Sequence, residues 1–215
     1  MGTRRDVVRA EDGTVLTAPG VGEGEALVLV HGAASDARQW ARVVPLLAAS
    51  LTVVAMERRG RGGSGPIRAG HSLAVEHGDI ASVVRSLPGP VHLLGHSSGA
   101  RFALDAARQL PDLASLILYE PPAPERFTAA ALEALDRLEA AGDRLGILRL
   151  FLLDVLDNDE ESFDHLQRRP IWPIMLDNAL TLPAELRATR HHRFDPSAFA
   201  GLAVPTLLMV GEQSG

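Results

Sequence analysis

A serine between two glycines carries the strongest chemical signal in this sequence. Residues 95–99 read Gly-His-Ser-Ser-Gly, which fits the pattern G-x-S-x-G with Ser97 at its centre. Where this pattern joins a strand to a helix, the serine sits on a sharp turn, and the glycines let the two elements approach closely. An apolar run at 91–94 precedes the motif, and a helical pattern follows it at 99–110. We therefore predict that Ser97 is a catalytic nucleophile and not an ordinary serine of a glycine-rich turn.

A second motif, His-Gly-Ala-Ala at residues 31–34, follows an earlier apolar run. Attack of a hydroxyl on an acyl group places negative charge on the carbonyl oxygen, and two fixed backbone N–H donors stabilise that charge strongly. Alone, His-Gly is an ordinary strand-to-loop turn, but its place upstream of the serine motif matches the order that such sites use. We assign the two oxyanion-hole donors to the backbone amides of Ala33 and Ser98.

The composition excludes several other classes of protein. The 215 residues, 46% of them hydrophobic, fit one compact domain with a substantial core. There is no cysteine, which rules out disulfides, thiolate catalysis and zinc sites built on sulfur. A formal charge of −6 without a basic cluster gives no footprint for nucleic acid or for an anionic membrane surface. We expect a cytoplasmic protein that acts on a small molecule and holds no metal or cofactor.

Strand and helix patterns alternate along the first part of the chain. The turn pair Asp12-Gly13 predicts an edge hairpin over residues 7–18. Short apolar runs of this kind are typical of strands buried on both faces, and their alternation with helices favours a mostly parallel sheet. The predicted strands are 26–30, 51–56, 91–94, 113–119 and 204–210, and the predicted helices are 37–49, 72–86 and 99–110.

A long helical segment interrupts this alternation. From residue 127 to about 193 the sequence is rich in Ala, Leu, Glu and Arg, with Thr128 as the expected N-cap of its first helix. We divide the chain into the N-terminal part of the core (1–122), a helical cap (123–198) and a short return to the core (199–215).

Four motifs in this order resemble the α/β-hydrolase superfamily, and the likeness runs from about residue 25 to residue 215. They are the strand and turn at 27–32, the arginine-rich loop at 56–64, the serine motif at 95–99 and the strand at 204–211. The loop departs from the family in having Glu57 where Asp is usual, and we expect its arginines to be structural. The resemblance implies an α/β fold, with a mostly parallel sheet flanked by helices and a helical cap insertion.

The resemblance also implies that an acid follows the serine along the chain. Most family members place an aspartate after the seventh strand, but here the corresponding position is Ser214. Some branches take the acid from the end of the strand that follows the nucleophile, which is the position of Glu120. We predict Glu120 as the catalytic acid, with Glu212 as the second candidate.

The histidine base of the family lies on a loop after an eighth strand. The run at 204–210 corresponds to the seventh strand, so we expect the eighth strand and the final helix to be absent from these residues. Among the eight histidines, His31 and His96 belong to motifs beside the serine but lie on the wrong elements to act as its base. The adjacent His191 and His192 favour a surface position over a base or a metal site.

The function implied by the resemblance is hydrolysis of a small, fairly apolar ester or related acyl substrate, with Ser97 as nucleophile and no cofactor. Hydrolysis of a C–C bond and cofactor-free perhydrolysis are alternatives on the same scaffold, because a fold does not determine its reaction. The alternative from another class is a non-catalytic, truncated protein that lacks the catalytic histidine.

Overall fold

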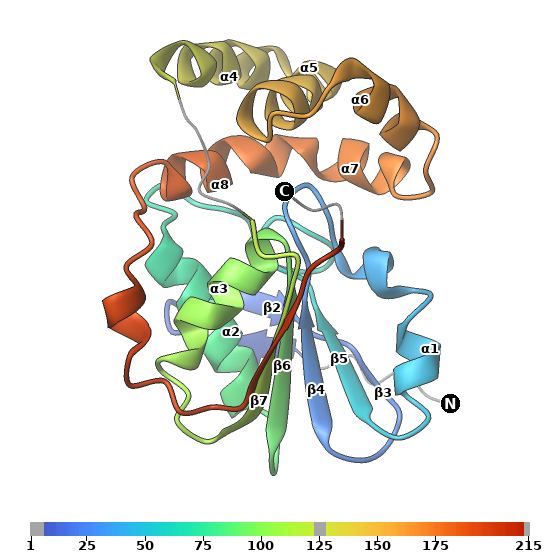
Figure 1. Ribbon diagram of the computed structural model, residues 1–215, viewed down its shortest axis with the longest axis vertical. Coiled ribbons are helices and arrows are strands. Elements are labelled where there is room, and N and C mark those ends of the chain that lie inside the picture. Colours follow the sequence, from blue (N-terminus) through green and yellow to red (C-terminus); the bar gives the residue numbers. More distant parts are fainter. Residues whose placement is uncertain (1–6, 123–127, 213–215) are drawn as a thin grey trace.

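The computed structural model of the protein describes residues 7–122 and 128–212. Its centre is a six-stranded sheet with the order β3-β5-β4-β6-β7-β8, in which only β3 runs antiparallel to its neighbour (Figure 1). The strands are β3 (Gly20–Val21), β4 (Ala26–Val30), β5 (Thr52–Met56), β6 (Val91–His96), β7 (Leu113–Tyr119) and β8 (Thr206–Met209). The prediction of a mostly parallel α/β-hydrolase sheet is confirmed.

Successive residues of the central strands pack against helices on opposite faces of the sheet, because side chains alternate along a strand. Val28 and Val30 of β4 join the core formed with α2 (Leu73–Arg85) and α3 (Ser98–Ala107). Leu27 and Leu29 join a second core on the other face. Both faces of β4 are therefore covered, which explains why this strand is apolar without interruption.

Two N-terminal elements differ from the expectation. The predicted edge hairpin forms as β1 (Val7–Arg9) and β2 (Val15–Thr17), but it makes a separate two-stranded sheet outside the main one. The predicted helix at 37–49 is two short helices, η1 (Ala37–Trp40) and α1 (Val44–Leu47). Pro45 lies in the first turn of α1, where its missing N–H is tolerated, but it could not continue a helix from residue 37.

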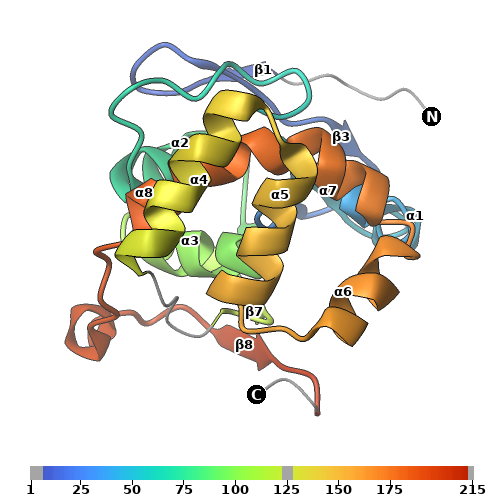
Figure 2. The same ribbon diagram turned by 90° about the horizontal axis from the view of Figure 1, so that it is seen from above.

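A layer of helices built by residues 128–189, called the helical insertion below, lies over the carboxyl ends of the strands (Figures 1 and 2). Thr128 caps its first helix as predicted, with its Oγ1 accepting a hydrogen bond from the Ala131 N–H at 3.1 Å. Gly142, with a φ of 66°, ends that helix. The elements are α4 (Ala129–Ala141), α5 (Arg144–Arg149), η2 (Leu150–Val155), α6 (Glu160–Gln167), α7 (Trp172–Asn178), η3 (Ala179–Thr181) and α8 (Leu182–Thr189). Residues 123–127 of the predicted cap lie outside the described residues.

Buried charges join the helical insertion to the core. Glu185 of α8 lies 2.9 Å from Arg58 and also pairs with Arg61, and all three side chains are at most 3% exposed. Arg58 in turn pairs with Glu76 of α2 at 2.7 Å. The arginines of this loop are thus buried and paired with carboxylates, in agreement with the structural role expected for them.

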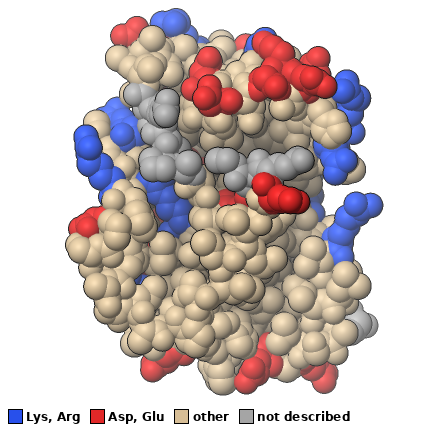
Figure 3. Space-filling model, in the orientation of Figure 1, with Lys and Arg blue, Asp and Glu red and all other residues tan. Residues whose placement is uncertain are grey.

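The outer strand β8 is uncovered on both faces. It lies within the strand predicted at 204–210, which corresponds to the seventh strand of the family, and its number here is higher by one. Leu207 and Leu208 point to opposite faces, and they are 53% and 58% exposed. Figure 3 shows the largely uncharged surface on this side. In the described ranges, none of the helices has the length and apolar character that a bilayer span requires.

Acid should weaken the fold through Glu76. Burial alone would raise the pKa of this carboxyl, but the charge of Arg58 and hydrogen bonds from His71 and Arg58 bring the pKa well below its usual value. A carboxylate of this kind stabilises the fold above its unfolded pKa of about 4.3, and that contribution is lost as the pH falls toward the folded pKa. We expect Glu76→Gln to lower the free energy of unfolding by about 3 kcal/mol at pH 7, because it leaves Arg58 without its partner. Urea unfolding between pH 7 and pH 3 should show this difference shrinking below about pH 4.

A matched control for that measurement is Glu160→Gln. Glu160 pairs with Arg149 on the surface of the helical insertion, where its side chain is 63% exposed. Exposed pairs contribute at most about 1 kcal/mol, so this variant should unfold almost like the parent protein at every pH. A Glu76→Gln effect that is equally large at pH 3 and pH 7 would contradict the electrostatic account.

Candidate active site

Ser97 occupies the turn between β6 and α3 in a backbone conformation that is rare for a residue with a side chain. Its φ is 54° and its ψ is −127°. The N–H of Ser97 donates to the carbonyl of Tyr119 on β7 at 2.9 Å, and its own carbonyl accepts from the Ala100 N–H at 2.9 Å. Contacts with a neighbouring strand and with α3 therefore hold the turn in a conformation that would cost roughly 1–3 kcal/mol in isolation.

The two glycines of the motif permit this turn because backbone atoms occupy the space that a side chain would need. A Cβ on Gly95 would lie 2.3 Å from the Gly99 carbonyl oxygen. A Cβ on Gly99 would lie 2.5 Å from the carbonyl oxygens of Val30 and His31, at the end of β4. The strand, the turn and the first residues of α3 thus fit together only without side chains at these positions.

The loop that follows β4 lies against the serine. A Cβ on Gly32 would lie 3.0 Å from the Cβ of Ser97. The next residue is Ala33, and neither its N–H nor that of Ser98 donates a hydrogen bond to another described residue. Ser98 opens α3, where the first N–H groups have no partner within the helix and carry its partial positive charge. The two amides predicted as oxyanion-hole donors therefore belong to segments that meet beside Ser97.

The helical insertion covers this loop. Ala34, which is fully buried and has a φ of 47°, belongs to the same apolar core as Leu148 and Phe151 of the insertion. Ala33 packs against that core as well. The side of the loop that faces the insertion is therefore apolar.

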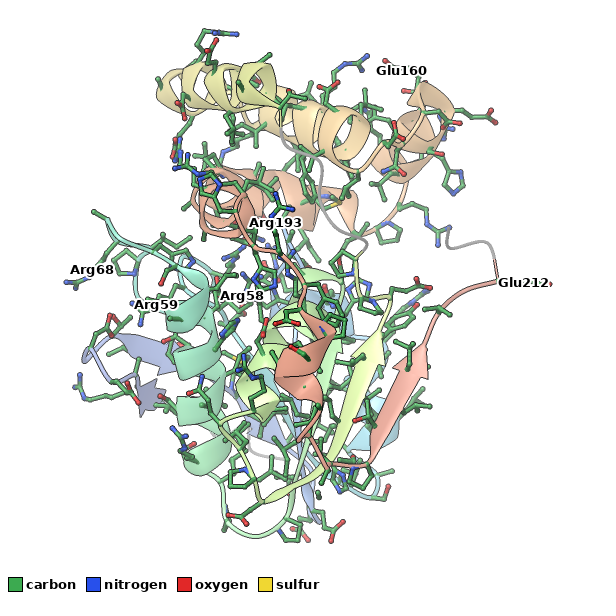
Figure 4. All side chains as sticks on the ribbon, turned by 60° about the vertical axis from the view of Figure 1, so that its left-hand side comes forward. Arg58, Arg59, Arg68, Glu160, Arg193 and Glu212 are labelled. Atoms are coloured by element: carbon green, nitrogen blue, oxygen red, sulfur yellow. The ribbon has the colours of Figure 1, made fainter. Side chains whose placement is uncertain are left out.

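Glu120 lies at the end of β7, next to the turn that holds the serine. Its N–H donates to the carbonyl of Met209, and its Oε1 accepts the N–H of Gly211 at 2.5 Å. The preceding residue, Tyr119, accepts the hydrogen bond from Ser97 described above. The structure thus brings Glu120 to the same edge of the sheet as Ser97. Glu212, the second acid candidate, is exposed and points away from the body of the molecule (Figure 4).

Neither histidine of the two motifs is arranged to act on Ser97. The Nδ1 of His31 lies 2.9 Å from the Gly32 carbonyl oxygen, and its Nε2 accepts the N–H of Arg58 at 3.2 Å. His96 packs against the rings of Trp40 and Tyr119, at centroid distances of 6.2 and 5.0 Å. Burial lowers the pKa of both histidines, although the nearby Glu120 opposes this shift at His96. Within residues 7–122 and 128–212, no histidine is hydrogen-bonded to the hydroxyl of Ser97.

Several contacts around the site have no signal in the sequence. The Nε2 of Gln39 lies 3.4 Å from Nδ1 of His96. The Oε1 of Gln39 accepts a hydrogen bond from the Ser35 hydroxyl at 2.7 Å. Asp36, directly after the loop, accepts the side-chain amide of Asn178 from the helical insertion at 2.7 Å. The Gln39–His96 and Asp36–Asn178 contacts join residues that lie far apart in the chain, so only the folded arrangement reveals them. Among the described side chains, no group of three or more His, Asp or Glu is placed to hold a metal ion.

Comparison with known proteins identifies relatives of this chain. The family model described as "Alpha/beta hydrolase family" matches residues 27–214. A fluoroacetate dehalogenase from a Burkholderia species is 38% identical over 117 residues, which cover 52% of this chain and 38% of the relative. An N-formylmaleamate deformylase from Pseudomonas putida is 40% identical over 105 residues, which cover 47% of this chain and 39% of the relative. The matches thus span well under half the length of these relatives.

A solved structure extends the likeness over nearly the whole chain. An alpha/beta hydrolase from Sphaerobacter thermophilus is 30% identical and superimposes with a TM-score of 0.87, covering 97% of this chain and 82% of that one. The relatives named here are hydrolases of one fold. With the matched family model and the strand, turn and helix around Ser97, these findings show that the chain belongs to the alpha/beta hydrolase family.

Proposed function

We propose that the protein is a serine hydrolase that acts on a small, fairly apolar ester or related acyl substrate. The observation that carries the proposal is the backbone of Ser97, whose positive φ is maintained by glycine contacts on both sides of the turn. Strain of this kind persists where the surrounding structure enforces it, and it is concentrated at functional sites.

In the proposed reaction the hydroxyl oxygen of Ser97 attacks the acyl carbon and its proton passes to a base, a role for which neither His31 nor His96 is arranged. The N–H groups of Ala33 and Ser98 donate to the carbonyl oxygen as it gains negative charge. The proton then moves from the base to the leaving alcohol as the ester bond breaks, and an acyl-enzyme forms. Water, activated by the same base, releases the acid and restores the serine. Glu120 is the proposed acid that orients the base and stabilises its charged form.

The preference for an apolar acyl group rests on the surface that covers the site. We propose that the helical insertion acts as a cap whose apolar side chains bound the acyl pocket, beside Ala33 and Ala34. Many apolar side chains of the insertion, such as Leu148, Phe151 and Met175, are buried in its own core. Ile171 and Trp172 are only partly buried at its margin, so they remain available to a ligand.

A second candidate function is a non-catalytic protein that binds a small ligand in the same place. It is favoured by the absence of a histidine hydrogen-bonded to Ser97 among the described residues. Without a neighbouring base a serine hydroxyl is a poor nucleophile. The two candidates differ in one measurable property, turnover that depends on Ser97.

Replacing Ser97 should abolish hydrolysis of a short-chain p-nitrophenyl ester. For Ser97→Ala we expect turnover to fall by at least about a thousand-fold, because the acyl-enzyme can no longer form. The matched control is Ser98→Ala, which keeps the proposed N–H donor and removes only a buried hydroxyl that has no hydrogen-bond partner. This control should hydrolyse the ester like the parent protein.

Melting curves of all three proteins show whether each is folded. Hydrolysis that survives unchanged in a folded Ser97→Ala variant would refute the nucleophile. A folded parent protein without any turnover would favour the binding protein instead.

The two acid candidates are separated by neutral, isosteric substitutions. We expect Glu120→Gln to lower kcat by about a hundred-fold to ten-thousand-fold, because the base would lose the charge that stabilises its protonated form. Glu212→Gln should leave kcat within about two-fold, since exposed carboxylates far from a reaction exert little influence on it. The reverse result, with only Glu212→Gln impaired, would assign the acid to Glu212.

A further inference from the structure

One carbonyl oxygen beside the serine accepts hydrogen bonds from two side chains. The Gly32 carbonyl oxygen lies 2.9 Å from Nδ1 of His31 and 3.3 Å from Nη1 of Arg58. This carbonyl and the N–H of Ala33 belong to the same peptide group. Donors that polarise the carbonyl end of a peptide strengthen its N–H as a donor, because hydrogen bonds in a chain polarise one another.

Arg58 also determines which nitrogen of His31 carries the proton. Its backbone N–H donates to Nε2 of His31 at 3.2 Å, so Nε2 must be unprotonated. The neutral imidazole then carries its proton on Nδ1, which donates to the Gly32 carbonyl. Burial of His31, together with the nearby charges of Arg58 and Arg61, lowers its pKa and keeps the ring neutral. Arg58 therefore acts on this peptide both directly and through His31.

Carboxylates from two other elements hold the Arg58 guanidinium in place. Glu76 of α2 accepts from its Nε at 2.9 Å and from its Nη2 at 2.7 Å. Glu185 of the helical insertion lies 2.9 Å from the same Nη2. The guanidinium carbon lies 4.6 Å from the ring centre of Phe102. In Figure 4, Arg68 projects outward at the edge of the molecule, whereas Arg58 lies toward the interior.

We infer that Arg58 is a positioning residue of the oxyanion hole, because it orients and polarises the Gly32–Ala33 peptide. Through its ion pair with Arg58, Glu185 makes this positioning role depend on the position of the helical insertion. The inference rests on the proposed function, since it assigns a role to the Ala33 donor. Arg58 is only 1% exposed, and the contact lies in a region of low dielectric, where a fixed charge acts strongly on its neighbours. The guanidinium is suited to this task because it can reach two carboxylates and a carbonyl at once, which a lysine ammonium cannot do in the same geometry.

The test compares Arg58→Lys with Arg59→Lys. Arg59 is the matched control because it is the next residue, is also buried, and pairs with Asp79 at 2.6 Å, but has no hydrogen bond to Gly32. For Arg58→Lys we expect kcat for the p-nitrophenyl ester to fall roughly ten-fold with KM nearly unchanged, since the lost interaction is made mainly in the transition state. Arg59→Lys should lose stability to a similar degree but keep its kcat.

A second readout does not depend on turnover. In protein labelled with ¹³C and ¹⁵N, the carbonyl resonance of Gly32 and the amide resonance of Ala33 report the hydrogen bonds at that carbonyl. Both should move upfield in Arg58→Lys and stay in place in Arg59→Lys. If Arg58→Lys does not fold, Glu185→Gln replaces it, with the same direction of change in kcat and in both resonances.

The outcomes separate this inference from the proposed function. Unchanged Gly32 and Ala33 resonances in the Arg58 variant would overturn the inference whether or not the protein hydrolyses esters. Shifted resonances with an unchanged kcat, in a protein that requires Ser97, would overturn the positioning role and leave the nucleophile intact. A parent protein without Ser97-dependent turnover would refute the hydrolase, while the resonances still decide whether Arg58 polarises this peptide.

Discussion

Close backbone contact at Gly95 and Gly99 is the constraint on which the candidate site depends. The first turn of α3 rests on the carbonyl groups at the end of β4, within distances that leave no room for a Cβ at Gly99. This contact brings the serine turn and the loop after β4 together, so Ser97 and two backbone amides from separate segments meet at one edge of the sheet. The positive φ of Ser97 is a consequence of the same fit, because the turn must reverse within two residues to enter the helix.

The helical insertion is attached through polar pairs that flank this edge. On one side Glu185 meets the buried arginines after β5, and on the other Asn178 donates to Asp36 directly after the loop. Breaking a buried hydrogen bond or ion pair leaves a polar group without its partner, so these pairs oppose displacement of the insertion. The loop that contains Ala33 is thereby enclosed between the core and the insertion, with its backbone oriented by Arg58 and His31.

Much of the architecture follows from local patterns. Strands covered on both faces are typically rich in apolar residues, and the sequence shows an unbroken apolar run at β4 and mainly apolar runs at β5, β6 and β7. Predictions from local patterns were wrong where contacts with distant residues, or a single proline, determined the structure. The hairpin at the N-terminus pairs with itself and packs on α2 instead of extending the sheet, and Pro45 divides a segment whose apolar spacing alone predicts one helix.

The sequence by itself determined the serine turn and the order of the elements around it, because both depend on residues that are neighbours along the chain. The tight turn requires glycines two positions from Ser97, and the apolar run before them predicts the strand that enters the turn. Both signals come from neighbouring residues. Only the tertiary structure decided which side chains act on the Gly32 carbonyl, which carboxylates neutralise Arg58, and how His31 and His96 are engaged. Those partners come from segments that are distant in the chain, and hydrogen bonds and ion pairs form only between atoms that folding brings within about 3 Å of each other.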